Sequence, residues 1–111
     1  MKQPLTKTEI YKNISEICEG DTILQNQKIE DTWTINSLLY CLEWLDYDYG
    51  VHVDINTTYG MYIPVRKYND PPVFIPASIR NKKAIITDVE SYPVDTDDEE
   101  NYIYLFIIKE V

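Results

Sequence analysis

A change in the spacing of apolar residues near Gly50 most constrains the fold of this chain. Before Gly50 they recur every three or four positions, which is typical of helices packed by one face, and after it they alternate with polar residues, which is typical of strands. Helices grouped ahead of strands predict an α+β domain: two N-terminal helices packed on a four- to five-stranded, mainly antiparallel sheet. The length of 111 residues predicts a single domain covering 1–111.

Both expected helices have recognisable ends. The first covers about 7–19, because Thr6-Lys7-Thr8-Glu9 has the pattern of a capping box and Gly20 is a natural stop. The second covers about 34–48 and ends at Gly50. Apolar residues at helical spacing predict the two core faces. They are Ile10, Ile14, Ile17 and Cys18 in the first helix, and Ile35, Leu38, Leu39, Leu42 and Leu45 in the second.

The second half of the chain reads as a series of strands. These are expected at about 51–55, 61–68, 73–75, 84–90 and 101–110. Pro64 favours an edge or a bulge for its strand, whereas 101–110 is apolar on both faces and is expected at the centre. Residues 22–29 fit either a short edge strand or a loop. The six residues 95–100 include five acids, which cannot be buried together, so they predict a solvated hairpin loop.

The net charge is −9, from 19 acids and 10 bases. Such a field repels nucleic acid and anionic membranes and attracts basic protein surfaces, although acidity also serves solubility alone. We therefore expect no direct binding to nucleic acid or membrane.

The two cysteines and the first ten residues indicate a cytoplasmic location. Cys18 and Cys41 form no CxxC pair and accompany a single histidine, so neither a zinc site nor another metal site is expected. Residues 1–10 lack the apolar core of a signal peptide, and no stretch has the length of a transmembrane helix. A reducing compartment with two free thiols follows.

The sequence carries no recognisable catalytic machinery. It has no phosphate loop, dinucleotide fingerprint or HExxH motif. His52, the only histidine, has no nucleophile nearby in sequence and is expected to be a surface or hydrogen-bonded residue. The acidic run at 95–100 lacks the EF-hand spacing. We expect a protein that is not an enzyme and uses no cofactor.

Helix 34–48 carries a second stripe, made of Tyr40, Trp44 and Tyr47 at i, i+4 and i+7, roughly opposite its core face. Either another layer such as the first helix covers these rings, or they form a binding surface. Carboxylates at i, i+3 lie about 5–6 Å apart, comparable with the spacing of about 3.4 Å between phosphates along a DNA strand. The acids of this helix, continuing to 95–100, therefore predict an imitation of a phosphate track.

In size, acidity and element order the chain resembles the small acidic uracil-DNA glycosylase inhibitors of phages and staphylococcal mobile elements, which are DNA mimics. In that family an acid–hydroxyl–apolar segment leads into the second helix and occupies the enzyme's DNA-binding cleft. The second helix helps to form an apolar pocket that captures a protruding side chain of the enzyme. The nearest segment here is Glu30-Asp31-Thr32-Trp33, and the family's Glu-Ser-Ile form is absent.

The resemblance implies an inhibitor that occupies the DNA-binding cleft of a basic DNA-handling enzyme, uracil-DNA glycosylase first, in a 1:1 complex. Phosphate imitation is expected from Glu30, Asp31, Glu43, Asp46 and Asp48, and apolar contact from Trp33, Leu38, Leu42 and Trp44, with Thr32 and Tyr47 also at the interface. The alternatives are an immunity or antitoxin protein, an anti-restriction or anti-CRISPR protein, and an accessory subunit whose aromatic stripe packs on a basic partner.

Overall fold

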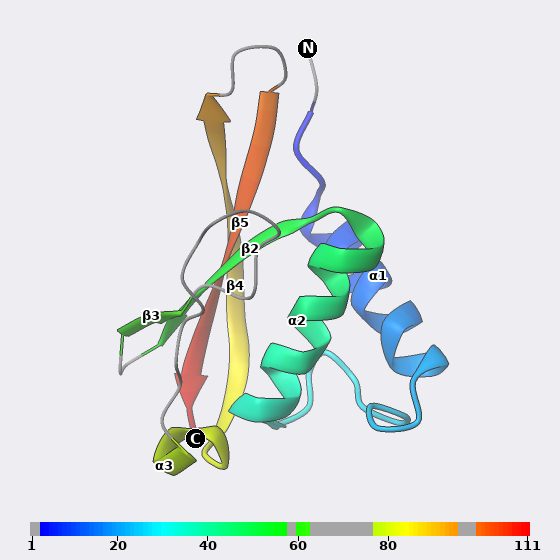
Figure 1. Ribbon diagram of the computed structural model, residues 1–111, viewed down its shortest axis with the longest axis vertical. Coiled ribbons are helices and arrows are strands. Elements are labelled where there is room, and N and C mark those ends of the chain that lie inside the picture. The colour runs from blue at the N-terminus through cyan, green and yellow to red at the C-terminus, as the bar shows by residue number, and fades with distance from the viewer. Residues whose placement is uncertain (1–2, 58–59, 63–76, 96–99) are drawn as a thin grey trace.

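The computed structural model describes residues 3–57, 60–62, 77–95 and 100–111, and it has the predicted α+β architecture (Figure 1). Two N-terminal helices lie side by side against one face of a mixed, mostly antiparallel sheet. Within the described residues, no helix is both long and apolar enough to cross a membrane.

Helix α1 spans Lys7–Gly20, within one residue of the prediction. Its capping box is formed: the Glu9 N–H donates to the Thr6 hydroxyl at 3.2 Å, and the Glu9 carboxylate accepts the Thr6 N–H at 3.1 Å. Residues 21–32 then form turns, so the alternative of an edge strand at 22–29 is excluded. The predicted core face of α1 is buried throughout.

Helix α2 spans Ile35–Tyr49 and has a cap at each end. The Ser37 N–H donates to the Thr34 hydroxyl at 3.1 Å. Gly50 adopts φ +64°, and its N–H donates to the Asp46 carbonyl at 3.1 Å. This left-handed conformation is the reason that glycine ends the helix.

The sheet contains five strands in the order β1-β4-β5-β2-β3. Their bounds are β1 Trp33–Thr34, β2 His52–Thr57, β3 Gly60–Tyr62, β4 Lys83–Asp95 and β5 Glu100–Glu110, and the short helix α3, Ala77–Arg80, precedes β4. Strands β4 and β5 pair antiparallel as far as Asp95 and Glu100, which confirms the predicted hairpin. Strand β4 extends beyond the predicted range 84–90 at both ends and carries a bulge between Ile86 and Asp88.

Strand β5 is central, as its two apolar faces predicted, but its pairing with β2 is parallel. The other three pairs are antiparallel, so the sheet is mainly antiparallel, as predicted, with one parallel pair. Strands β3 and β4 intervene along the chain, so β2 and β5 are joined by a long connection, which parallel pairing requires. The expected strand 61–68 is described only at its start, and 73–75 lies outside the described residues.

The core lies between the helices and one face of the sheet, where Trp33 and Phe106 are the largest fully buried side chains. The segment before α1 is fastened to the sheet, because the Leu5 N–H donates to the Tyr104 hydroxyl at 2.8 Å. Lys7 forms an ion pair with Asp88 on β4. The N-terminal end of α1 is thereby held against the sheet.

Candidate functional site

Three of the expected partner contacts lie in the core. Trp33 is 0% exposed, Leu38 1% and Leu42 0%. Trp33 sits in β1 opposite Ala84, and the two leucines are on the side of α2 that packs into the core. These three side chains are buried in the core, so the prediction that they contact a partner is wrong for this structure.

Asp46 was expected to face outward, but the structure places it inside. It is 7% exposed, and its Oδ1 lies 3.6 Å from Nδ1 of His52 on β2. Successive helical residues are rotated by about 100°, which places Asp46 beside the buried Ile35 and Leu42. Its carboxylate therefore belongs to the junction of α2 with the sheet. His52 is an exposed strand residue with a polar partner, as predicted.

Tyr40, Trp44 and Tyr47 form a row of rings, which we call the aromatic ladder. Neighbouring rings meet edge to face, with centroids 6.4 Å and 6.3 Å apart and interplanar angles of 76° and 85°. Tyr40 is half-buried and donates its hydroxyl to Asp21 Oδ2 at 2.7 Å, whereas Trp44 is 37% and Tyr47 70% exposed. The chain after α1 thus holds one end of the ladder, and the other end is open to a partner.

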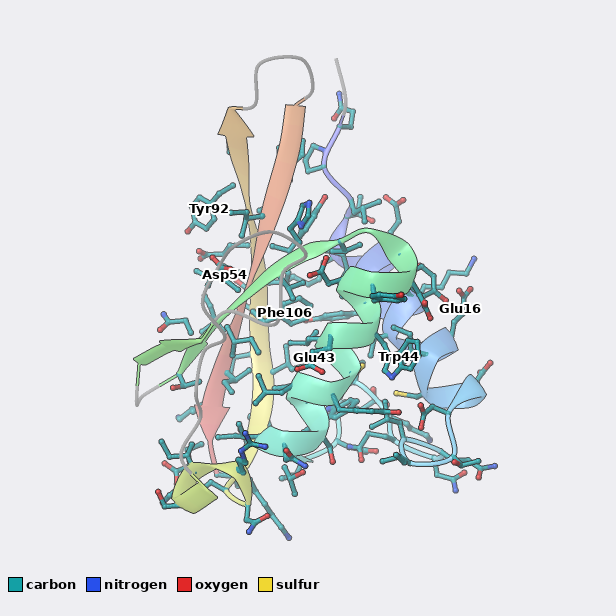
Figure 2. The ribbon with its side chains drawn as sticks, in the orientation of Figure 1. Glu16, Glu43, Trp44, Asp54, Tyr92 and Phe106 are labelled. Carbon is teal, nitrogen blue, oxygen red and sulfur yellow. The ribbon has the colours of Figure 1, made fainter. Side chains whose placement is uncertain are left out.

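A groove of about 300 Å³ lies between α1 and α2, and we call it the helix groove. It is lined by Glu16, Ile17, Gly20, Asp21, Trp44, Asp48 and Tyr49. The Tyr49 hydroxyl donates to Glu16 Oε2 at 3.0 Å, which ties the two helices together across the groove. Figure 2 shows Glu16 and Trp44 where the helices lie side by side. The groove therefore combines two aromatic rings with three carboxylates.

Hydrogen bonds at the groove shift the pKa values of two groups in opposite directions. The Tyr40 hydroxyl, and then the Ile23 N–H, hold the pKa of the Asp21 carboxyl below its ordinary value. The same bond to Asp21 raises the pKa of Tyr40. Both shifts arise because the hydrogen bond favours a neutral phenol paired with a carboxylate, so Asp21 remains negative throughout the neutral range.

A second hollow, of about 550 Å³, lies between the C-terminal half of α1 and the following loop. Its lining includes Glu19 and Glu30, together with Lys28. Glu16 and Glu19 are at i, i+3 on the outer face of α1, about 5–6 Å apart by helix geometry. Glu16 and Asp48 line the helix groove, and Glu19 and Glu30 line the second hollow, so the carboxylates of the two hollows adjoin on α1. We call these four residues the acidic row.

Sequence reasoning missed Glu16, Glu19, Asp21 and Tyr49. A signal for the α1 acids was present, because Glu16 and Glu19 fall opposite the stripe of Ile10, Ile14 and Ile17 on a helical projection. Nothing local in the sequence indicates that Tyr49 reaches α1.

The segment expected to enter an enzyme cleft leads into β1, an edge strand of the sheet. Glu30 and Thr32 are exposed. Asp31 is half-buried, and its Oδ2 accepts the Lys28 N–H at 2.8 Å, so it shapes the turn before the strand. This segment presents two of its four predicted contact residues to solvent.

Glu43 is exposed but lies on another side of α2 from Trp44, toward the sheet (Figure 2). Partial burial raises the pKa of its carboxyl, and the positive charge of Arg80 opposes this shift. The acids predicted on α2 therefore do not share one side of the helix, and only Asp48 joins the acidic row. The loop 96–99, which was expected to extend the track, lies outside the described residues.

Neither metal nor thiol chemistry is suggested by the described residues. Within them, no group of three or more His, Cys, Asp or Glu side chains could hold a metal ion. Cys18 and Cys41 are buried free thiols, and burial raises the pKa of both.

The chain matches no protein-family model, no curated protein and no solved structure. The resemblance to the glycosylase inhibitors therefore remains one of size, acidity and element order.

Proposed function

We propose that this chain is a protein inhibitor that occupies the basic DNA-binding cleft of a DNA-handling enzyme as a DNA mimic, with uracil-DNA glycosylase as the first target. The observation that carries the proposal is the acidic row running beside the exposed aromatic ladder. Charge and apolar anchors thus occur together on one side of the helix pair.

The acidic row supplies the charge that a cationic cleft would attract. Glu16 and Glu19 repeat at helical spacing, and Asp48 and Glu30 extend the row on either side. Carboxylates at the rim of an interface steer a basic partner and raise its association rate, and salt weakens this contribution.

The aromatic ladder supplies contact that salt does not screen. Tyr and Trp are enriched among residues that dominate binding energy, because they bury much area at a small cost in conformational entropy. Tyr40 and Trp44 are already fixed by their neighbours. A partner that covers Tyr47 and Trp44 would therefore meet an ordered surface.

The exposed Glu30 and Thr32 support insertion into a cleft. Both side chains are exposed and closely precede β1, an edge strand of the sheet. An exposed acid and hydroxyl at the edge of the sheet are accessible to the walls of a partner's cleft.

The test is uracil excision from duplex DNA by purified glycosylase, with and without micromolar inhibitor. We expect loss of excision, a 1:1 complex and mutual exclusion with duplex DNA. The double variant Glu16→Gln/Glu19→Gln should weaken binding. Glu90→Gln/Glu110→Gln, which removes the same charge elsewhere, should have a smaller effect.

Two outcomes would count against the proposal in different ways. No inhibition at micromolar protein would remove the glycosylase as the target. Binding of a basic protein that leaves its DNA in place would end the mimicry idea, and would favour the immunity or antitoxin alternative.

A further inference from the structure

We propose that the helix groove receives an arginine side chain of the partner, with the guanidinium against Trp44 and between the carboxylates of Glu16 and Asp48. This inference rests on the proposed function, because it assumes a basic protein partner, and it names the group that this partner inserts. The argument depends on the size, lining, charge and order of the groove.

The groove has room for one long side chain. Its volume of about 300 Å³ is at the lower limit of pockets that enclose small organic ligands, about 300–1,000 Å³. A helix or a strand of the partner would not fit between α1 and α2. One side chain projecting from the partner's surface would.

The lining favours a cation. Glu16, Asp21 and Asp48 line the groove, and no lysine or arginine is among the described residues that do so. The second hollow differs, because Lys28 contributes to its lining. Of these two hollows, the helix groove is therefore the one whose carboxylates have no basic residue beside them in the lining.

The rings favour arginine over lysine. A guanidinium is planar, stacks on aromatic faces and can donate to two carboxylates at once, whereas an ammonium is a compact and strongly hydrated charge. Trp44 and Tyr49 both line the groove. Phosphate, the alternative occupant of many protein grooves, would be repelled by the three carboxylates.

The receiving groups are ordered before binding. The Tyr49 hydroxyl holds Glu16 through Oε2, and Oε1 has no hydrogen-bond partner among the described residues. The indole of Trp44 is fixed between the rings of Tyr40 and Tyr47. Binding of a guanidinium would therefore cost little conformational entropy in the groups that receive it.

The experiment compares oligoarginine and oligolysine peptides of equal length, titrated into the whole chain and followed by the indole N–H signals in ¹H–¹⁵N NMR spectra. Trp33 is 0% exposed and serves as an internal reference. We expect the Trp44 signal to move with oligoarginine, with an affinity about two- to fivefold above that for oligolysine.

Matched variants separate the groove from general attraction to an acidic protein. Glu16→Gln keeps an acceptor for Tyr49 and removes one charge. Asp48→Asn removes one charge from the α2 side of the groove with little change of shape. Each should weaken oligoarginine binding about two- to fivefold. Glu90→Gln, with its charge on β4, should leave the binding nearly unchanged.

Equal binding of the two peptides, or equal weakening by Glu16→Gln and Glu90→Gln, would overturn the inference. Inhibition of uracil excision is measured separately. If inhibition persists when the arginine preference is absent, the groove assignment fails alone. If the arginine preference is present but no DNA-binding enzyme is inhibited, the proposed function fails and the groove remains a site for some other basic partner.

Discussion

Trp44 and Tyr47, the two exposed rings of the aromatic ladder, should contribute differently to folding, because they are buried to different extents. Trp44 is 37% exposed and Tyr47 is 70% exposed, so about two thirds of the first residue and about one third of the second leave water when the chain folds. Replacing each by alanine tests whether the ladder is partly core and partly binding surface.

The expected magnitudes follow from buried area. With about 250 Å² for an indole and about 200 Å² for a phenol, the buried parts are about 160 and 60 Å². At about 25 cal/mol per Å² these areas correspond to upper values of about 4 and 1.5 kcal/mol. The unfolded chain already hides part of this surface, so we expect losses of about 2–3 kcal/mol for Trp44→Ala and about 1 kcal/mol for Tyr47→Ala.

The assay is urea denaturation followed by far-UV circular dichroism, with the dependence of the free energy of unfolding on urea compared among variants. Tyr92→Ala is a matched control, since Tyr92 is 48% exposed on β4 and outside the ladder. Tyr47→Ala should weaken partner binding with little loss of stability, whereas Tyr92→Ala should leave binding intact. Equal destabilisation by Trp44→Ala and Tyr47→Ala would refute the reasoning from burial.

Three further outcomes can be checked on the same chain. Asp46→Ala should lower the free energy of unfolding by about 1–3 kcal/mol, because it removes a nearly buried carboxylate that lies beside His52, whereas exposed Asp48→Ala should change it by less than about 0.5 kcal/mol in urea denaturation. Tyr40→Phe should raise the pKa of Asp21 toward its ordinary value of 3.8, because the hydrogen bond from the Tyr40 hydroxyl is lost. Since the pKa of Asp21 is depressed in the folded state, this hydrogen bond stabilises the fold at neutral pH, and the stabilisation is lost as the pH falls through that folded pKa. An unchanged NMR titration of Asp21 in the variant would contradict this. Gly50→Ala should cost about 1–2 kcal/mol in thermal unfolding, because φ is +64° and no atom lies within 4 Å of the added Cβ, so backbone strain alone opposes it; no loss would argue against the left-handed cap.

The helices could be predicted from the sequence because their signals are local. Thr6 and Glu9 form their reciprocal cap within a single turn, and Gly50 supplies the left-handed end of α2. The central position of β5 was also predictable, since a strand with apolar side chains on both faces is typical of the middle of a sheet and not of its edge.

The composition of the candidate surface was less predictable, because it depends on how elements meet. A two-residue strand has no period, so nothing local indicates that Trp33 turns inward. Helix α2 packs on both α1 and the sheet, which buries a wider arc than one apolar stripe and brings Asp46 inside. The parallel pairing of β2 with β5 likewise depends on residues about fifty positions apart.

The central position of β5 has a consequence for how the protein is made. Strand β5 is the only link between the β1–β4 pair and the β2–β3 pair in the described sheet. Until residues 100–110 have left the ribosome, these two halves cannot join, and the inner faces of α1 and α2 have no complete sheet to cover them. Folding to completion therefore waits until β5 has emerged, and a nascent chain that stalls before β5 would present its apolar helix faces to chaperones.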